Sequence, residues 1–359
     1  MRNRFFKLTV IIFASTFFYF QPTTALLAES KNAAFLSPID NIKLKLIKKF
    51  PEADLEKNGL ILSQPWSISL DEAGTIYLLD AKEAKVFKIT ESSDKVLFFG
   101  KRGQGPGEFN FPLKIGLSRD KIWVFDPSAR QIQFFDRNGK FIKMIKLFHR
   151  YNDVIVDQKY RLICTKNIKV NEEAKKIIDI LDENGNIILS LGEPDKMDDI
   201  PVGLLNDFLL SVFKGKIIAA SRSTGAIKVY DEQGELVEEI DLLKNYLKEA
   251  ADINIKSFKK AVSPGKSRPY AHLFESIKSF NNAIYFLRSQ PGKYEIIRIV
   301  ENDSKFNIDK IYTYKTEGVL AIDFDIFQVP DLSLPLFYVI NLGREESNLL
   351  KLTPEGGIK

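Results

Sequence analysis

The residue types that most often perform acid–base, nucleophilic or metal chemistry are scarce in this chain. Of its 359 residues, two are histidine and one is cysteine. These counts exclude a three-imidazole site, an internal disulfide and a cysteine-based zinc site. Cys164 lies within an apolar run, so we expect a buried, inert thiol. Neither His149 nor His272 belongs to a recognisable Ser or Cys partner motif. The sequence therefore predicts no catalytic residue, no metal ligand and no cofactor.

Basic side chains are the second chemical feature, and many of them are concentrated in one segment. The chain carries 52 Lys and Arg against 47 Asp and Glu, a formal charge of +5. Residues 244–270 alone hold seven basic and two acidic residues. Clustered cations favour an anionic ligand, whereas the alternative is that they only solvate a loop. We predict a cationic binding face that consists of Arg130, Arg222, Arg288, Arg344, Lys259, Lys260, Lys266 and Arg268.

The first 28 residues have the pattern of a secretory signal. Three basic residues precede an apolar run over residues 8–20, and small residues follow it. This pattern predicts that residues 1–28 are removed during export, which leaves a mature chain, 29–359, in the periplasm or outside the cell. The alternative is an uncleaved anchor, although 13 apolar residues are short for a membrane span. Export argues against nucleic acid as a partner, and we expect no membrane span in the mature chain.

A repeated turn sequence indicates how the mature chain is organised. Three copies of the tetrapeptide Asp-x-[Asn/Gln]-Gly begin at Asp136, Asp182 and Asp231, at intervals of 46 and 49 residues. Each copy lies between two runs of β-branched or aromatic residues, and its glycine supplies the positive φ that a tight hairpin needs. Looser copies bring the number of turns to six, at residues 91–94, 301–304 and 353–356.

Each turn belongs to a unit of four expected strands. Strand-like runs such as residues 76–80 and 122–126 precede the hairpins, and a further run precedes each of these. Units of about 45–55 residues with four antiparallel strands are typical of β-propeller blades, although two packed sandwiches are an alternative. We therefore predict an all-β, six-bladed propeller with four-stranded antiparallel blades. Residues 41–50 would close the last blade, and residues 244–270, with a short helix over 242–251, would form an insertion between blades four and five.

The motifs of the second unit resemble the NHL repeat. That repeat combines a glycine-rich loop, a proline, an apolar strand that ends in Asp, and a strand with Gln and Phe before the turn. The matching residues are Gly103-Gln-Gly-Pro-Gly-Glu-Phe109, Phe111-Pro112, Ile122-Trp-Val-Phe-Asp126, Ile132-Gln-Phe-Phe-Asp136 and Gly139-Lys-Phe141. One departure is that Gln131 separates Arg130 from Ile132. The mature chain is similar to secreted bacterial six-bladed propellers of this type. The resemblance implies the fold but not the function, because NHL-type propellers include RNA-binding modules, sensor domains and an amidating lyase.

Two polar features are expected to be structural. The glycine-rich residues 103–107 lack the Lys and Ser/Thr of a phosphate-binding loop, so we interpret them as a crossing between blades. Asp80 and Asp126 end equivalent strands, where an Asp side chain more often accepts backbone hydrogen bonds than binds a metal.

Two functions remain open at this point. The first is a non-enzymatic propeller outside the cytoplasm that binds an unknown protein, a peptide or an anionic glycan through the cationic face. The alternative is a metal-dependent hydrolase or lyase similar to the lactonases, with Ca²⁺ held in the central channel. The expected inner strands offer oxygen ligands for such an ion at Asp323, Asp325, Glu275 and Asn206.

Overall fold

The computed structural model describes residues 39–51, 53–90, 96–168, 175–261, 271–329, 334–343 and 346–356. The chain divides into two compact units, residues 1–33 and 34–359, and every described residue belongs to the second. The expected signal, residues 1–28, lies outside the described residues. Within the described part, no helix is long and apolar enough to cross a membrane.

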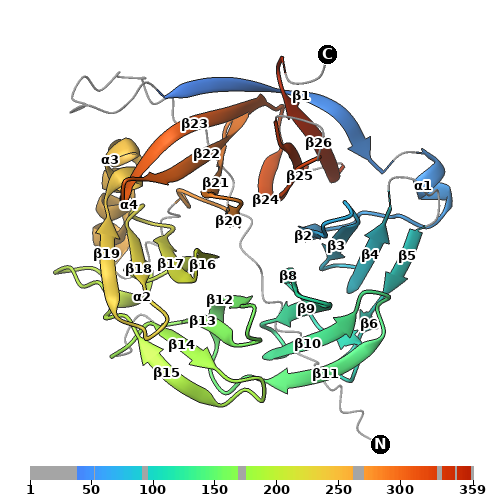
Figure 1. Ribbon diagram of the computed structural model, residues 1–359, viewed down its shortest axis with the longest axis horizontal. Helices are drawn as coiled ribbons and strands as arrows, with labels where there is room; N and C mark the ends of the chain where they lie inside the picture. Colours follow the sequence, from blue (N-terminus) through green and yellow to red (C-terminus); the bar gives the residue numbers. More distant parts are fainter. Residues whose placement is uncertain are drawn as a thin grey trace, which may run out of the picture. The chain divides into compact units, whose positions relative to one another are not determined.

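Four separate four-stranded antiparallel sheets make up most of the second unit (Figure 1). Their strands follow one another in chain order, with the first strand innermost and the fourth outermost. The first sheet contains β2 (Pro65–Leu70), β3 (Ile76–Asp80), β4 (Lys85–Ile89) and β5 (Val96–Phe99), and the second contains β8 (Lys114–Ser118), β9 (Lys121–Asp126), β10 (Gln131–Asp136) and β11 (Phe141–Lys146). The third contains β12 (Tyr151–Val156), β13 (Leu162–Lys166), β14 (Ile178–Leu181) and β15 (Ile187–Leu191), and the fourth contains β16 (Phe208–Phe213), β17 (Lys216–Ser221), β18 (Ile227–Tyr230) and β19 (Leu236–Ile240).

The remaining long strands form one eight-stranded sheet, so the prediction of six separate four-stranded blades is wrong. The order of this sheet is β20-β21-β22-β23-β1-β26-β25-β24. β1 (Asp40–Phe50) joins its two halves, because its first residues pair in parallel with β23 and its later residues pair antiparallel with β26. The sequence assigned residues 41–50 to the last blade alone, but this 11-residue strand extends along both neighbours (Figure 1). The other members are β20 (Ser276–Phe280), β21 (Ala283–Gln290), β22 (Lys293–Asn302), β23 (Lys305–Lys315), β24 (Leu320–Phe327), β25 (Leu336–Leu342) and β26 (Asn348–Pro354).

The innermost strands of this unit form a closed ring. β2, β8, β12, β16, β20 and β24 contact one another in this order, and β24 contacts β2. Apolar side chains fill the space between neighbouring sheets, where Trp123 and Phe134 of the second sheet pack with Val154 and Cys164 of the third. The described part of the unit is therefore an all-β protein with a β-propeller arrangement.

The predicted Asp-x-[Asn/Gln]-Gly turns connect the third and fourth strands of three sheets. The carboxylate of Asp136 accepts hydrogen bonds from the N–H groups of Asn138 at 2.8 Å and Lys140 at 2.9 Å, and Gly139 has a φ of 84°. Asp182 and Asp231 hold their turns with the same pattern of hydrogen bonds. The prediction of strand–turn–strand units at these three positions is confirmed.

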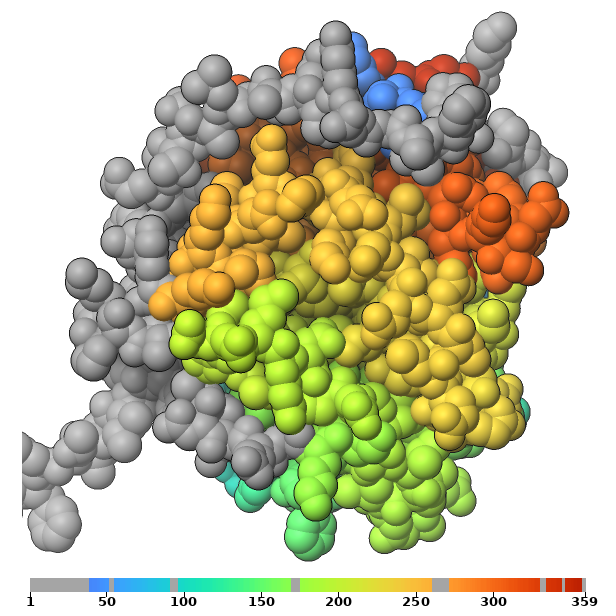
Figure 2. Space-filling view, turned by 90° about the vertical axis from the view of Figure 1, so that its left-hand side faces the viewer, coloured from blue at the N-terminus to red at the C-terminus, as the bar shows by residue number. Residues whose placement is uncertain are grey.

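Helices occupy the long crossing between β19 and β20. α3 (Leu242–Tyr246) is followed by α4 (Lys248–Ala261), which continues well beyond the short helix expected over residues 242–251. Leu243 of α3 packs into the core between the fourth sheet and the eight-stranded sheet, and Phe258 of α4 packs near α2 (Val202–Leu205). Figure 2 shows α3 and α4, in yellow and orange, beside the yellow-green segment around α2. The short elements α1 (Ala53–Lys57), β6 (Lys101–Arg102) and β7 (Glu108–Phe109) complete the described structure.

Candidate functional site

One end of the strands carries both the crossings between sheets and the connections between second and third strands. The strand register shows this, because the start of an inner strand pairs with the end of the next strand: Tyr151 with Lys166, and Phe208 with Ser221. We call this end the crossing face. The opposite end, which carries the turns at Asp136, Asp182 and Asp231, is the turn face.

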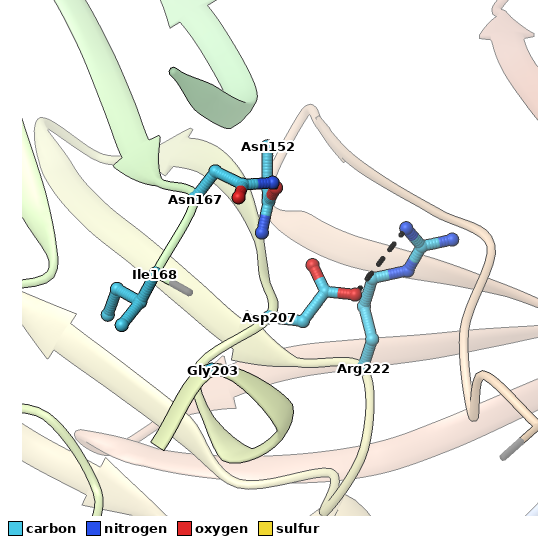
Figure 3. A pocket seen from close by; sticks show the side chains of 6 residues that line it. All are labelled: Asn152, Asn167, Ile168, Gly203, Asp207 and Arg222. Atoms are coloured by element: carbon cyan, nitrogen blue, oxygen red, sulfur yellow. Dashed lines mark hydrogen bonds and ion pairs between the residues drawn. The ribbon is translucent and has the colours of Figure 1, made fainter. Parts of the chain in front are cut away.

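A pocket with a volume of about 290 Å³ opens on the crossing face between the third and fourth sheets (Figure 3). This volume lies near the lower end of the range for small-molecule sites. The lining residues come from β12, the loop after β13, α2, and the loops that precede β16 and follow β17: Asn152, Asn167, Ile168, Gly203, Asp207 and Arg222. Four of the six have polar side chains, so the pocket suits a polar ligand.

Arg222 is held between two other segments of the chain. Its Nε donates a hydrogen bond to the carbonyl of Phe274 at 3.2 Å, and its Nη2 lies 3.3 Å from Oε2 of Glu275. Its Nη1 lies 3.9 Å from Oδ2 of Asp207 (Figure 3). The side chain is largely buried, at 21% exposed, so these two carboxylates compensate its charge inside the protein.

His272 joins the same group of side chains. Its Nε2 lies 3.7 Å from Oδ2 of Asp207, and its Nδ1 lies 3.4 Å from Oε2 of Glu275. We call Asp207, Arg222, His272 and Glu275 the charged cluster. Two members of the cluster, Asp207 and Arg222, line the pocket, where a carboxylate and a guanidinium are able to orient a ligand by hydrogen bonds.

Two exposed amide side chains form the opposite wall of the pocket (Figure 3). The Nδ2 of Asn167 donates a hydrogen bond to Oδ1 of Asn152 at 2.5 Å. Among the described residues, no other partner is found for the Nδ2 of Asn152 or the Oδ1 of Asn167. This wall therefore offers a ligand both a donor and an acceptor.

The residues predicted for the cationic face occupy different surroundings. Arg222 lines the pocket, whereas Arg288 forms an ion pair with Glu295 at 3.2 Å. Arg130 is exposed in the connection after β9 and has a φ of 48°, and Lys259 is exposed on α4. Lys266, Arg268, Arg344 and the side chain of Lys260 lie outside what the structure describes. A shared cationic face stays a prediction, and the structure adds that two of its arginines are already paired with carboxylates.

The sequence did not predict the partners that Arg222 finds on the crossing face. Asp207 and His272 come from segments that precede β16 and β20, and their approach to Arg222 depends on how the fourth and fifth inner strands lie in the ring. A weak signal was available, because Asp207 directly precedes an apolar run and Asn167 follows one. Asp207 precedes a first strand and Asn167 follows a second strand, and these two strand ends meet on the crossing face.

The glycine-rich crossing is held by the second sheet, as expected. Gln133 of β10 accepts a hydrogen bond from the N–H of Gly107 at 2.7 Å and donates to the carbonyl of Glu108 at 2.5 Å. Asp126 accepts hydrogen bonds from the N–H groups of Asn110 at 2.5 Å and Phe111 at 3.1 Å. The interpretation of residues 103–107 as a structural crossing is confirmed.

Asp80 has the same role in the first sheet. Its carboxylate accepts hydrogen bonds from the N–H groups of Ser63 and Gln64, each at 2.8 Å, and from those of Lys82 and Glu83 in its own loop. Burial raises the pKa of Asp80, although these donors act in the opposite direction. The prediction that Asp80 and Asp126 cap the chain is confirmed by these contacts.

Carboxylates on the innermost strands hold neighbouring sheets together. Asp323 of β24 accepts hydrogen bonds from the hydroxyls of Ser67 at 2.8 Å and Ser276 at 2.5 Å, which belong to β2 and β20. Lys278 lies 3.7 Å from Asp323 and donates to the carbonyl of Ile68 at 3.1 Å. These groups connect three inner strands to one another.

The oxygen ligands considered for Ca²⁺ have other partners within the protein. Asp325 accepts a hydrogen bond from the N–H of Leu70 at 2.7 Å, and burial raises the pKa of its carboxyl group, which disfavours the ionised form. Glu275 belongs to the charged cluster, and Asn206 accepts from the N–H of Asp195 at 2.8 Å. Within the described ranges, no group of three or more His, Cys, Asp or Glu is placed to hold a metal.

Cys164 is fully buried in β13, and burial raises the pKa of its thiol well above the ordinary value. A thiol in this state is a poor nucleophile. The expectation of a buried cysteine is confirmed.

Comparisons with known proteins identify the fold but no family. No protein-family model matches the chain, and no curated protein matches it in sequence. A solved structure of a Bacteroides fragilis protein described as exported matches with a TM-score of 0.55 and 12% identity, covering 90% of this chain and 100% of that one. A streptogramin B lyase matches with a TM-score of 0.50 and 13% identity, covering 87% and 98% of the two chains. The PQQ-bound aldose sugar dehydrogenase of Streptomyces coelicolor matches with a TM-score of 0.50 and 12% identity, with the same coverages of 87% and 98%. At these identities the likeness shows only a shared propeller arrangement.

Proposed function

We propose that this protein is a non-enzymatic binding propeller that holds a small, neutral, hydroxyl-rich ligand in the pocket between its third and fourth sheets. The observation that carries this proposal is the composition of the pocket wall, where two amides face a carboxylate and a guanidinium. A sugar hydroxyl both donates and accepts hydrogen bonds, and side chains of these types offer both partners. Saccharides are therefore the ligand class that we would test.

The pairing of Arg222 favours a neutral ligand over the anionic ligand that the sequence suggested. Asp207 and Glu275 both lie within 3.9 Å of its guanidinium. An anion in the pocket would be repelled by these two carboxylates and would compete with them for the same donors. A neutral ligand avoids both costs.

We further propose that the protein acts outside the cytoplasm. The N-terminal pattern of basic, apolar and small residues supports export, and so does the described location of the Bacteroides fragilis neighbour. The NHL-like motifs of the second sheet fit a secreted propeller of this kind. Periplasm and cell exterior are equally compatible with these observations.

The enzymatic alternative has less support from the residues of this chain. Structural neighbours include a lyase and a dehydrogenase, so the arrangement is compatible with catalysis. The carboxylates of the inner strands, however, are engaged by hydroxyl, backbone and lysine donors of neighbouring strands. These contacts hold neighbouring inner strands together, so the carboxylates give no support to a metal-dependent reaction.

A saccharide panel tests the proposal. Isothermal titration of the wild-type protein with neutral methyl glycosides and disaccharides, and with oligomers of uronic acids, should show binding of a neutral sugar. We expect Asp207→Ala to weaken that binding at least about tenfold, because it removes a charged acceptor from the pocket wall.

Glu232→Ala is the matched control for this variant. It also removes one carboxylate from an ion pair, that with Lys159 at 2.5 Å, but it lies on the turn face. Unchanged sugar affinity in this control is expected. Binding of uronic acids alone, or equal losses in Asp207→Ala and Glu232→Ala, would contradict the proposal.

A further inference from the structure

β1 presents a row of basic and apolar side chains on its outer side. Figure 1 shows this strand, in blue, along the outer circumference of β23 and β26. From Lys43 onward, its exposed residues are Lys43, Lys45, Leu46, Ile47 and Lys49, and we call them the β1 strip; Asp40 and Asn41 at the start of β1 are exposed as well. Leu46 and Ile47 are 45% and 42% exposed, and the outer strands β5, β15 and β19 also expose adjacent apolar pairs.

A register shift explains why two adjacent apolar side chains are exposed together. The pairing of β1 with β26 is irregular between Leu46 and Lys48, so the strict alternation of side chains is interrupted there. On either side of this point, Leu44 and Phe50 are buried in the core, at 5% and 0% exposed. The inner side of β1 thus packs against the core, and its outer side is exposed to solvent.

The lysines of the strip retain positive charge for a partner. Lys49 forms an ion pair with Glu346 at 2.8 Å. Within the described residues, Lys43 and Lys45 have no ion-pair partner. The strip therefore combines exposed cations with exposed apolar surface.

The outer strand of the fourth sheet differs from β1 in charge. β19 also exposes two adjacent apolar residues, Leu236 at 48% and Val237 at 49%. They are followed by Glu238 and Glu239, and no lysine lies in this strand. The two strands have similar apolar exposure but opposite charge.

We propose that the β1 strip docks on an anionic lipid bilayer. Basic side chains beside exposed apolar ones are typical of surfaces that bind the headgroup region, because the cations attract anionic lipid and the apolar groups enter the boundary layer. Docking of this kind needs no membrane span.

Vesicle co-sedimentation tests the proposal on the chain that begins at Glu29, whose described core lies wholly within residues 39–356. We expect binding to phosphatidylcholine vesicles that contain phosphatidylglycerol, weak binding to pure phosphatidylcholine, and loss of binding at high salt. Each lysine near an anionic surface strengthens binding about fivefold, so K43E/K45E should weaken it at least about 25-fold. L46S/I47S should weaken it as well while the charge stays the same.

The matched control is K82E/K140E, which reverses two exposed lysines on the first and second sheets and changes net charge by the same amount. Circular dichroism and urea unfolding of all variants establish that each is folded. An equal loss in the control would show that net charge alone is responsible and would overturn the proposal. The proposal would also be overturned by failure of the wild-type chain to bind the anionic vesicles, or by equal binding to both kinds of vesicle.

Discussion

Two crossings occupy equivalent places in the ring but use their polar groups differently. Residues 100–113 lead into the second sheet, and residues 192–207 lead into the fourth. In the second sheet, the last residue of β9 is Asp126, whose carboxylate binds the N–H groups of the crossing. In the fourth sheet, the equivalent residue of β17 is Ser221. Its hydroxyl accepts a hydrogen bond from the N–H of Thr224 and forms another with the hydroxyl of Ser223, both in its own loop. The crossing into the fourth sheet is thus released from this cap.

Both crossings keep a second attachment, to the third strand of the sheet that follows. Gln133 holds the crossing at Gly107 and Glu108, and Lys228 lies 2.5 Å from the carboxylate of Asp195 in the other crossing. The cap, in contrast, is present in only one of these two crossings. In the fourth sheet, which lacks this cap, Asp207 and Arg222 line the pocket. The candidate site therefore lies where the sequence departs from the repeat.

The largest effect should come from removal of the cap in the second sheet. Asp126→Ala leaves the N–H groups of Asn110, Phe111 and Ala129 without an acceptor in a site where Asp126 is 0% exposed. Each buried donor without a partner costs about 1–3 kcal/mol, so we expect a loss of about 3–5 kcal/mol in the free energy of unfolding. Urea denaturation measures it.

Ser221→Ala provides the matched comparison in the fourth sheet. Because one backbone N–H donates to this hydroxyl, at 3.1 Å from Thr224, we expect a loss of about 1 kcal/mol. If Ser221→Ala destabilised the protein as much as Asp126→Ala, the difference between the two crossings would not exist.

A smaller effect should follow loss of the third-strand attachment. Gln133→Ala removes three hydrogen bonds to the glycine-rich crossing from a side chain that is 0% exposed. We expect the free energy of unfolding to fall by about 2 kcal/mol. Faster hydrogen exchange at the N–H of Gly107 should accompany this loss.

Gln104→Ala changes an exposed glutamine in the same loop and should stay within about 0.5 kcal/mol of wild type. If Gln133→Ala destabilised the protein no more than this control, the glycine-rich crossing would not depend on Gln133 for its stability.

The turns were predictable from sequence because their geometry is local. Asp136 and Gly139 lie three residues apart and make their contacts within one hairpin, so residue type alone identifies them. The fusion of the last two units was not predictable in this way. The alternation over residues 41–50 indicates a strand, but its pairing with both β23 and β26 depends on where distant strands end in space.

The candidate site was predicted only in part for the same reason. Arg222 could be found because it follows a strand of the repeat. Its contact with Glu275 joins residues 53 positions apart, and no local pattern specifies that approach. A position where the repeat lacks its usual Asp, such as Ser221, indicates the location of the candidate site better than a local motif does.

Asp325 is a titratable group on β24, one of the innermost strands of the ring. Burial raises the pKa of Asp325 above its ordinary value, so the folded state binds a proton more tightly than the unfolded state. The contribution of this group to stability is present below the ordinary pKa and is lost as pH rises through the raised one. We therefore expect the stability advantage of wild type over Asp325→Asn to shrink from acid to neutral pH, in urea titrations at several pH values. An advantage that grew with pH would show that the carboxylate is stabilised in its ionised form.

The smallest effect on stability should be found at the pocket wall. Asn167 is exposed and makes a side-chain hydrogen bond to Asn152, which is also exposed, so Asn167→Ala should change the free energy of unfolding by no more than about 0.5 kcal/mol. The same substitution removes an acceptor from the pocket, and we expect the affinity for a bound neutral sugar to fall about fivefold to tenfold. Asn138→Ala, an exposed asparagine in a hairpin turn of the turn face, is the control and should leave sugar affinity unchanged. Asn167 would then contribute to binding but not to folding. In the capped crossing of the second sheet, by contrast, the polar side chains contribute to stability. Loss of stability in Asn167→Ala comparable to that in Gln133→Ala would place Asn167 among the groups that hold the ring.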